Sequence, residues 1–461
     1  MNEETLLWYD LESFGLETDK TRIAQFAAIR TDLDFNLVAE PINIMCCLAP
    51  DYLPTPESCL VTGQTPQQVN TEGLVEAEFI SIIHKEFMQK NTTVVGFNNL
   101  NYDDELVRHT LYRNLYSPYE REFGDGRTKW DILPLARAVH DLRPEGINFF
   151  HKTPKGNPQL KLTTLTEDNK IEQVGAHDAL VDVYATINFA KLVKTKQPAL
   201  YNYFFKNRTK AAIKKTLSEL KNNKILLHTD QSHTNNYGFT RPIFLLTTIN
   251  EKTNNVYYFD LTQDANDLLK DFNTSNEVKG LGILKLNKCP CLTAISMLEK
   301  EVELQNRLNI DMAKYRKNVE ILMNHPELED IILSKEKPYE AEEKDIDFNL
   351  YSAGFPSYEI TNEYKRIQKA DKKDKIKMAS ASTKEKVFRY VARSYPEALT
   401  EDEMVKWRSF VKDRIGNINE YYEKINDTYN NLSRFDITPE KGKLILEKLV
   451  EYAKEIEKEY L

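Results

Sequence analysis

The sequence predicts an α/β protein of several domains, in which an α/β domain is followed by a small β-rich domain and a helical domain. The chain has 461 residues, enough for about three domains of ordinary size. β-type apolar runs alternate with helical patterns in the first part, short β-type runs dominate the middle, and amphipathic helical patterns fill the end. Hydrophobic residues make up 41% of the chain, so each part can bury a core.

The first domain is expected over residues 1–196. Asp178 is a candidate N-cap of its clearest helix, and Pro198 is expected to end that helix. Strands are expected at residues 6–9, 23–29, 37–47 and 93–97, and helices at residues 76–88, 103–114, 129–142 and 178–197. This order is typical of a sheet covered by helices.

The remaining chain divides at about residue 345. Residues 197–345 begin with a basic helical segment at 206–224 and continue with short strands, which indicates a barrel or a curled sheet. Those strands are expected at residues 225–228, 241–250, 255–261 and 282–286. Residues 346–461 are expected to be helical, with helices at 383–395, 402–415, 418–432 and 439–460.

The charge distribution and the cysteines argue against several classes of protein. The net charge is −9, and the acidic excess lies in residues 1–196, with 19 Lys and Arg against 29 Asp and Glu. That balance argues against nonspecific coating of DNA, although basic segments such as 206–224 and 365–377 could still line a local groove. No apolar run reaches the roughly 18 residues of a membrane span, and the acidic start does not resemble a secretory signal. The five cysteines fit neither a zinc site nor a disulfide framework, so we expect a cytoplasmic protein.

Four carboxylates and one histidine stand at positions that favour a shared site. Asp10 and Glu12 follow the first apolar run as D-x-E, and on a strand both side chains point to one face. Asp103 starts a helix after a buried strand, and His177 and Asp182 form H-x4-D at the start of the clearest helix. Hard oxygen ligands of this kind suit a pair of Mg²⁺ ions, which can hydrolyse a phosphodiester, and a nearby imidazole can accept the proton of the attacking water.

Each of these signals is weak alone. A D-x-E is expected by chance in a chain with 71 acidic residues, and Asp103 and His177 could simply cap helices. The joint order, with every member at a strand end or a helix start, favours the site. We interpret the neighbouring Asp104 as a first-turn helix charge and Asp178 as a cap.

The combined pattern resembles a known family. D-x-E, N-x3-D at Asn99–Asp103 and H-x4-D match the three exonuclease motifs of the DEDD superfamily in its histidine subtype. Longer phrases at residues 25–32, 142–148, 176–186, 191–195 and 287–290 resemble the bacterial exodeoxyribonuclease I family. The resemblance is strong over residues 1–205, patchy in the middle and weak at the helical end.

The resemblance implies an RNase H-like exonuclease domain, an SH3-like β-barrel domain and a C-terminal helical domain. It implies a 3′→5′ exonuclease that is specific for single-stranded DNA, acts in DNA repair and recombination, and releases 5′-mononucleotides. By this resemblance, Asp10, Glu12, Asp103 and Asp182 hold two Mg²⁺ ions, with Mn²⁺ as a plausible substitute, and Asp10 bridges them. His177 is the general base.

The same resemblance suggests contacts with DNA and with a protein partner. Arg108, Tyr119, Arg137 and Lys161 match DNA-contacting positions, although Lys161 stands where the family usually has Arg and so lacks the bidentate fork. Arg143 and Tyr203 match a site for the acidic C-terminal tail of single-stranded DNA-binding protein. Simpler roles remain open: a solvated helix face for Arg108, core packing for Tyr119, a helix cap for Arg143 and interdomain packing for Tyr203. We expect a monomer without membrane contact.

Two other functions fit parts of the sequence. The first is a related exoribonuclease or a proofreading-type exonuclease, but such chains are normally one domain, and this one carries about 265 further residues. The second is a catalytically inactive scaffold that binds single-stranded DNA, but the set of four carboxylates and His177 is intact.

Overall fold

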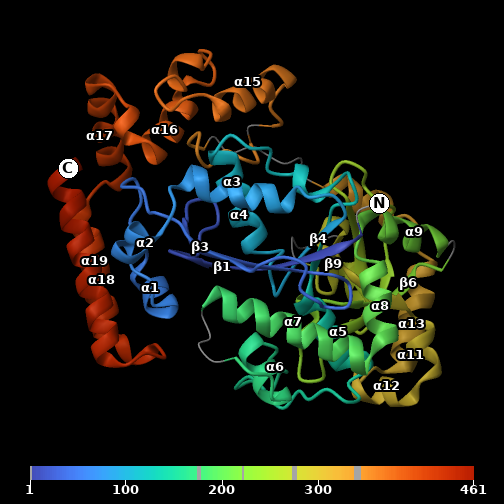
Figure 1. Cartoon of the computed structure of the whole chain (residues 1–461). Helices are drawn as coiled ribbons and strands as arrows, with labels where there is room; N and C mark the ends of the chain where they lie inside the picture. The colour runs from blue at the N-terminus through green and yellow to red at the C-terminus, as the bar shows by residue number, and fades with distance from the viewer. Residues whose placement is uncertain (1–2, 174–177, 221–222, 272–277, 337–343, 353) are drawn as a thin grey trace.

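The computed structural model describes residues 3–173, 178–220, 223–271, 278–336, 344–352 and 354–461. Its first part is built on a five-stranded sheet in the order β3-β2-β1-β4-β5 (Figure 1). β1 runs antiparallel to β2, with Leu6 opposite Thr31, and parallel to β4, which in turn runs parallel to β5. The strands are β1 (Thr5–Ser13), β2 (Ile23–Thr31), β3 (Ile42–Met45), β4 (Thr92–Gly96) and β5 (Thr128–Asp131).

Helices cover both faces of this sheet because the side chains of β1 alternate between two cores. Leu6 and Trp8 belong to the core shared with α5 and α7, whereas Leu7 and Tyr9 pack with α3 and α4 on the opposite face. The helices of this part are α1 (Pro56–Thr62), α2 (Pro66–Glu72), α3 (Glu76–Phe87), α4 (Asp103–Arg113), α5 (Ile132–Leu142), α6 (Leu162–Asn169) and α7 (Ala179–Lys196).

The middle of the chain forms a second five-stranded sheet in the order β10-β6-β7-β8-β9. Its strands are β6 (Ile225–Thr229), β7 (Thr240–Leu245), β8 (Asn255–Asp260), β9 (Leu281–Lys285) and β10 (Cys291–Ala294). The surrounding helices are α8 (Pro198–Lys206), α9 (Lys210–Glu219), α10 (Ala265–Asp271), α11 (Ser296–Lys300), α12 (Val302–Arg307), α13 (Met312–Met323) and α14 (Leu328–Lys335).

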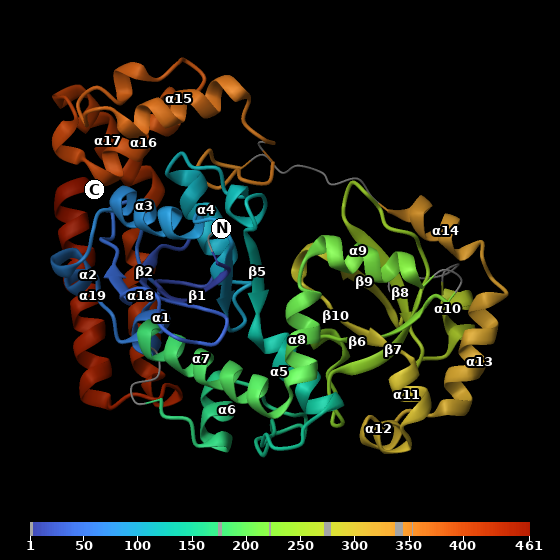
Figure 2. The same ribbon diagram turned by 45° about the vertical axis from the view of Figure 1, so that its right-hand side comes forward.

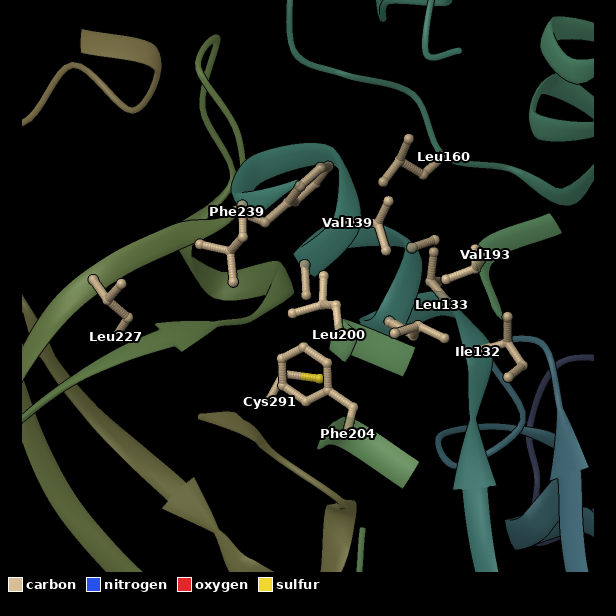
Figure 3. Packing of buried hydrophobic residues seen from close by; sticks show 14 of the residues in the cluster. Ile132, Leu133, Val139, Leu160, Val193, Leu200, Phe204, Leu227, Phe239 and Cys291 are labelled. Carbon is tan, nitrogen blue, oxygen red and sulfur yellow. The ribbon is translucent and has the colours of Figure 1, made fainter. Parts of the chain in front are cut away.

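The first and middle parts share one continuous core. Helix α5 lies between the two sheets, and its Leu133 and Val139 belong to the same buried cluster as Leu227 of β6 and Cys291 of β10 (Figure 3). Leu200 and Phe204 of α8 belong to the same cluster. Because separation would expose this apolar surface to water, the two parts are held together by hydrophobic burial.

The C-terminal helices pack against the first part (Figure 2). Helices α18 and α19 share a buried cluster with α1 and α2, while α16 packs on α3. The helices are α15 (Tyr358–Lys369), α16 (Lys384–Ser394), α17 (Glu401–Ile415), α18 (Ile418–Asn430) and α19 (Pro439–Tyr460). Within the described ranges, no helix has both the length and the apolar character required to cross a membrane.

Several sequence expectations need correction. Residues 128–131 form strand β5, and the helix expected from residue 129 begins only at Ile132, because Asp131 caps it through a hydrogen bond from the Leu133 amide (2.9 Å). Strand β10 was not expected, and β3 is shorter than the apolar run that predicted it. Within the basic segment 365–377, which could line a groove, Lys375 is buried and donates to carbonyl groups at the end of α15, so this lysine does not contribute its charge to a groove.

Candidate active site

Asp10, Glu12 and Asp182 form one cluster of carboxylates between β1 and α7. Asp10 and Glu12 continue the face of β1 that carries Leu6 and Trp8, which is the face that α7 covers. Asp182 lies in the first turn of α7. One carboxylate oxygen from each of the three residues lies within 4.8 Å of the others, as the D-x-E and H-x4-D patterns predicted.

Two neighbouring side chains position Asp182. Asp178 caps α7, as expected, by accepting hydrogen bonds from the amides of Leu180 (3.0 Å) and Val181 (3.4 Å). Gln173 donates from its Nε2 to Oδ1 of Asp182 (2.7 Å). The helix start and this amide together fix the carboxylate that faces β1.

Asp103 lies at the first residue of α4, buried and near the same cluster. Burial raises the pKa of Asp10, and the negative charges of Asp103, Glu12 and Asp182 raise it further. Burial and the charges of Asp182 and Asp103 likewise raise the pKa of Glu12 to about 9. Asp103 therefore acts electrostatically on the other carboxylates, although it is not part of the tight three-residue group.

The cluster has the chemistry of a divalent cation site. The charges that act most strongly on Asp10 and Glu12 all belong to other carboxylates, so ionising these groups together is unfavourable without a cation. Mg²⁺ and Mn²⁺ prefer such hard oxygen ligands. The donor set therefore fits the metals expected from the sequence.

Asp104, next to Asp103, faces a different environment. It accepts a hydrogen bond from the Tyr9 hydroxyl (2.7 Å), and its carboxylate lies 3.0 Å from the Arg121 guanidinium and 3.6 Å from the Lys129 ammonium. Burial opposes ionisation, yet Arg121, Lys129 and Arg108 hold its pKa well below the usual range. Asp104 lies in the first turn of α4, as expected, and it is also the centre of a buried ion-pair network.

The loop before Asp103 is fixed by Asp131. The backbone amides of Asn98 (2.8 Å) and Leu100 (3.5 Å) donate to the Asp131 carboxylate, and Asn98 adopts a left-handed conformation with φ 61°. At Gly96, an added Cβ would lie 2.7 Å from the Asn99 Cβ and 3.1 Å from the Tyr9 carbonyl oxygen. The turn that leads from β4 to Asp103 therefore requires glycine at this position.

His177 lies outside the described residues, so its expected role as general base stays a prediction. The described chain resumes at Asp178, immediately before α7.

Arg108 and Tyr119 lie together near α4. The Arg108 side chain is 6% exposed and pairs with Glu105 and with Glu122 (2.5 Å), so existing carboxylates already balance its charge. Its guanidinium carbon lies 5.8 Å from the centre of the Tyr119 ring, which also contacts Phe355 at 5.6 Å. Arg108 therefore contributes to the buried network and supports the half-buried Tyr119.

Arg137 and Lys161 are more accessible. Arg137 lies on the wall of a cleft of about 810 Å³ between the first and second sheets, where it donates to the side chain of Gln231. Lys161 is exposed at the residue before α6. The cleft is also lined by Asn98, Leu100 and Asn101, which belong to the segment that leads to Asp103.

Arg143 and Tyr203 are both partly exposed and partnered. Arg143 caps the end of α5 through its backbone amide, and its guanidinium forms two hydrogen bonds with Glu301 (2.6 and 3.0 Å). Tyr203 is 38% exposed and donates from its hydroxyl to the Leu292 carbonyl oxygen (3.1 Å). A ligand carboxylate at Arg143 would have to compete with Glu301.

Sequence reasoning missed the residues that hold this site in place. Gln173 gives no local signal, because a glutamine in a loop has no distinctive pattern. Asp131 could have been found, since an Asp between an apolar strand and a helical pattern is a typical N-cap. The partners of Asp104 come from β1, the turn Glu120–Glu122 and β5, and only the folded chain brings them together.

Comparisons with known proteins agree with this architecture. An Exonuclease family model matches residues 7–190, an Exonuclease I SH3-like domain matches residues 208–335, and an Exonuclease I C-terminal domain matches residues 344–456. The Exodeoxyribonuclease I of Haemophilus influenzae is 38% identical over 433 residues, covering 88% of this chain and 90% of that protein.

Solved structures extend the likeness over the whole chain. The crystal structure of Escherichia coli Exonuclease I in complex with a dA16 oligonucleotide has a TM-score of 0.91 and 32% identity, and covers 98% of this chain and 100% of that one. A crystal structure of SSB/Exonuclease I in complex with the inhibitor CFAM has a TM-score of 0.88 and 32% identity, and covers 99% of this chain and 100% of that one. With all three family domains in order and relatives matched over nearly their full length, the chain belongs to the bacterial exodeoxyribonuclease I family.

Proposed function

We propose that this protein is a metal-dependent 3′→5′ exonuclease that is specific for single-stranded DNA and releases 5′-mononucleotides, with roles in DNA repair and recombination. The observation that carries the proposal is the cluster of Asp10, Glu12 and Asp182, with Asp103 beside it, in a chain of the exodeoxyribonuclease I family. The oligonucleotide in the related E. coli structure supports a single-stranded DNA substrate.

The four carboxylates would hold two Mg²⁺ ions, with Asp10 as the shared ligand, and Mn²⁺ could replace them. When bound, such ions lower the pKa of the attacking water and neutralise charge on the phosphate. Gln173 keeps Asp182 oriented, and Asp131 fixes the loop that presents Asp103. We assign the removal of the proton from the attacking water to His177, because an unperturbed imidazole has a pKa near 6.5 and can accept a proton at neutral pH.

DNA contacts would come from residues in or next to α4, α5 and α6. Arg137 on the cleft wall and the exposed Lys161 can meet phosphates, and the Tyr119 ring can stack on a base, which is worth roughly 1–3 kcal/mol. Arg108, already paired with Glu105 and Glu122, would act mainly by supporting Tyr119.

The proposal also divides the chain into three domains. We place an RNase H-like exonuclease domain at residues 1–196, an SH3-like domain with flanking helices at 197–345 and a helical domain at 346–461. The end of α7 at Lys196 and the ranges of the three family models support these limits.

We also propose a partner, a cellular location and a monomeric state. The C-terminal tail of single-stranded DNA-binding protein would place its terminal carboxylate on Arg143 beside Tyr203, displacing Glu301, and the related SSB/Exonuclease I structure supports such a partner. All five cysteines are free thiols, which suits a reducing cytoplasm. Sedimentation of the purified protein checks the expected monomer.

One substrate panel tests the proposed activity. The protein is incubated with single-stranded DNA, single-stranded RNA and duplex DNA, each labelled at the 5′ end, with and without Mg²⁺. We expect Mg²⁺-dependent shortening of single-stranded DNA from its 3′ end, with 5′-mononucleotides as products. Preferential cleavage of RNA would favour an exoribonuclease, and binding of single-stranded DNA without cleavage would favour an inactive scaffold.

A further inference from the structure

The β-rich domain touches the segment that carries Asp103 through Lys288. Lys288 ends a short turn after β9, and its ammonium donates to the Leu100 carbonyl oxygen and to Oε1 of Glu105 (3.2 Å). The next residue, Cys289, has a left-handed backbone (φ 49°), and its thiol lies 3.5 Å from the Lys129 carbonyl oxygen. This turn therefore places the Lys288 ammonium of the β-rich domain against the backbone of the first domain.

Glu105 is the point where three parts of the chain meet. Its Oε1 accepts from Lys288 and from Arg108, and its Oε2 accepts from the hydroxyl of Tyr351, in the segment that leads into the helical domain. Burial raises the pKa of Glu105, but Arg108, Tyr351 and Lys288 more than offset this, so the group is held as a carboxylate. Glu105 is two residues after Asp103, and Leu100 is three residues before it.

The Asp103 segment is thus held from two sides. Within its own domain, Asp131 accepts hydrogen bonds from the amides of Asn98 and Leu100. From the neighbouring domain, Lys288 binds the Leu100 carbonyl on the wall of the 810 Å³ cleft (Figure 2 shows the second sheet on the β5 side of the first part). Loss of the second restraint would leave the start of α4 without its tie to the β-rich domain.

We propose that Lys288 is a positioning residue for the exonuclease centre. By binding Leu100 and Glu105 it sets the position of Asp103, so that the arrangement of the β-rich domain determines whether this carboxylate is aligned with the other three. This inference rests on the proposed function. Misplacement by about 1 Å of a group that positions the reactants can cost roughly 10²-fold in rate.

Lys285 offers a matched control. It lies on the same cleft wall, at the end of β9, and its side chain is exposed. Within the described part of the chain its ammonium forms no hydrogen bond or ion pair. Lys285→Met therefore removes the same charge from the cleft without releasing the Asp103 segment, and measures the purely electrostatic loss.

The experiment compares Lys288→Met, Lys288→Arg and Lys285→Met in the full chain. For each we measure kcat and KM on a short oligonucleotide, the Mg²⁺ concentration for half-maximal rate, and the Kd for single-stranded DNA. Hydrogen exchange of the amides of residues 98–105 reports directly on the segment. Tyr351→Phe, which removes one hydrogen bond to Glu105, provides a second variant should Lys288→Met fold poorly.

We expect Lys288→Met to lower kcat about 10²-fold, to raise the Mg²⁺ requirement and to speed exchange in residues 98–105. Its Kd for DNA should change no more than that of Lys285→Met. Lys288→Arg should recover part of kcat, and Tyr351→Phe should show a smaller loss of the same kind. Wild-type kcat or unchanged exchange in Lys288→Met would overturn the positioning role, as would a matching effect in Lys285→Met. A wild-type protein that cleaves none of the DNA substrates would instead refute the proposed function.

Discussion

Replacing Asp103 and Asp104 by asparagine, one at a time, should have opposite effects on stability and on cleavage activity. Asp104 is buried between the Tyr9 hydroxyl, the Arg121 guanidinium and the Lys129 ammonium, and its pKa is held low. Asp103 lies near other carboxylates, and its pKa is raised by burial and by its acidic neighbours Asp104 and Asp131. Asp104 in ionised form therefore stabilises the fold, whereas ionised Asp103 destabilises it until a cation binds.

The magnitudes follow from these environments. Removing one partner of a buried ion pair typically costs about 3–5 kcal/mol, because the remaining charges stay buried. In Asp104→Asn, the carboxylate that Arg121 and Lys129 would keep among the described residues is Glu122 (3.9 and 2.6 Å). At about 2–4 °C per kcal/mol for a domain of 150–250 residues, the expected fall in Tm is roughly 10 °C. Asp103→Asn should leave Tm unchanged or slightly higher in metal-free buffer, because it removes one repelling charge.

Thermal unfolding of both variants with EDTA, together with cleavage of single-stranded DNA at a temperature where both are folded, separates the two roles. We expect Asp103→Asn to be folded and inactive, and Asp104→Asn to be destabilised but active. Because the pKa of Asp104 is depressed in the folded state, its contribution is present above an unfolded-state pKa near 3.9 and is lost as pH falls below it. The stability deficit of Asp104→Asn should therefore shrink below about pH 4. A stable, inactive Asp104→Asn beside an unstable, active Asp103→Asn would reverse the two assignments.

Three further predictions concern the metal, the base and the partner. Mg²⁺ at ten times its Kd should stabilise the wild type by about 1.4 kcal/mol, and Glu12→Gln should lose most of that gain in a thermal shift with and without Mg²⁺; an equal shift in both would place the metal elsewhere. His177→Ala should lower the rate roughly 10²–10⁴-fold and regain activity as pH rises, because hydroxide replaces the base; full speed at neutral pH would reduce His177 to a structural residue. Arg143→Ala should weaken binding of an acidic tail peptide, measured by fluorescence anisotropy, while cleavage of naked DNA stays nearly unchanged; unchanged peptide affinity would place the docking site elsewhere.

The positions of the four carboxylates were predictable because each follows a local rule. Asp10 and Glu12 share a strand face, Asp103 begins a helix, and Asp182 follows the capped start of α7, so spacing alone indicates where each lies. The two faces of β1 could also be predicted, because successive side chains of a strand point to opposite faces of the sheet. Leu6 and Trp8 pack on one side, and Leu7 and Tyr9 pack on the other.

The supporting network could not be derived in this way. Arg108 was read as a solvated or DNA-contacting residue, but its partner Glu122 lies fourteen positions away across a turn. Lys288 reaches Glu105 across 183 positions, and no local pattern encodes such a contact. The helix expected from residue 129 also failed for a tertiary reason, because residues 128–131 pair with β4 and the pairing outweighs their helical pattern.

The most direct test of the central claim, that the carboxylate cluster on β1, α4 and α7 hydrolyses single-stranded DNA with bound metal, is a single-turnover assay of Asp10→Ala. Cleavage of 5′-labelled single-stranded DNA is followed with Mg²⁺ beside the wild type, and DNA affinity is measured on the same samples. We predict that cleavage falls by several orders of magnitude while DNA affinity persists, because binding depends on phosphate contacts and base stacking at other residues. Near-normal cleavage by Asp10→Ala would contradict the account.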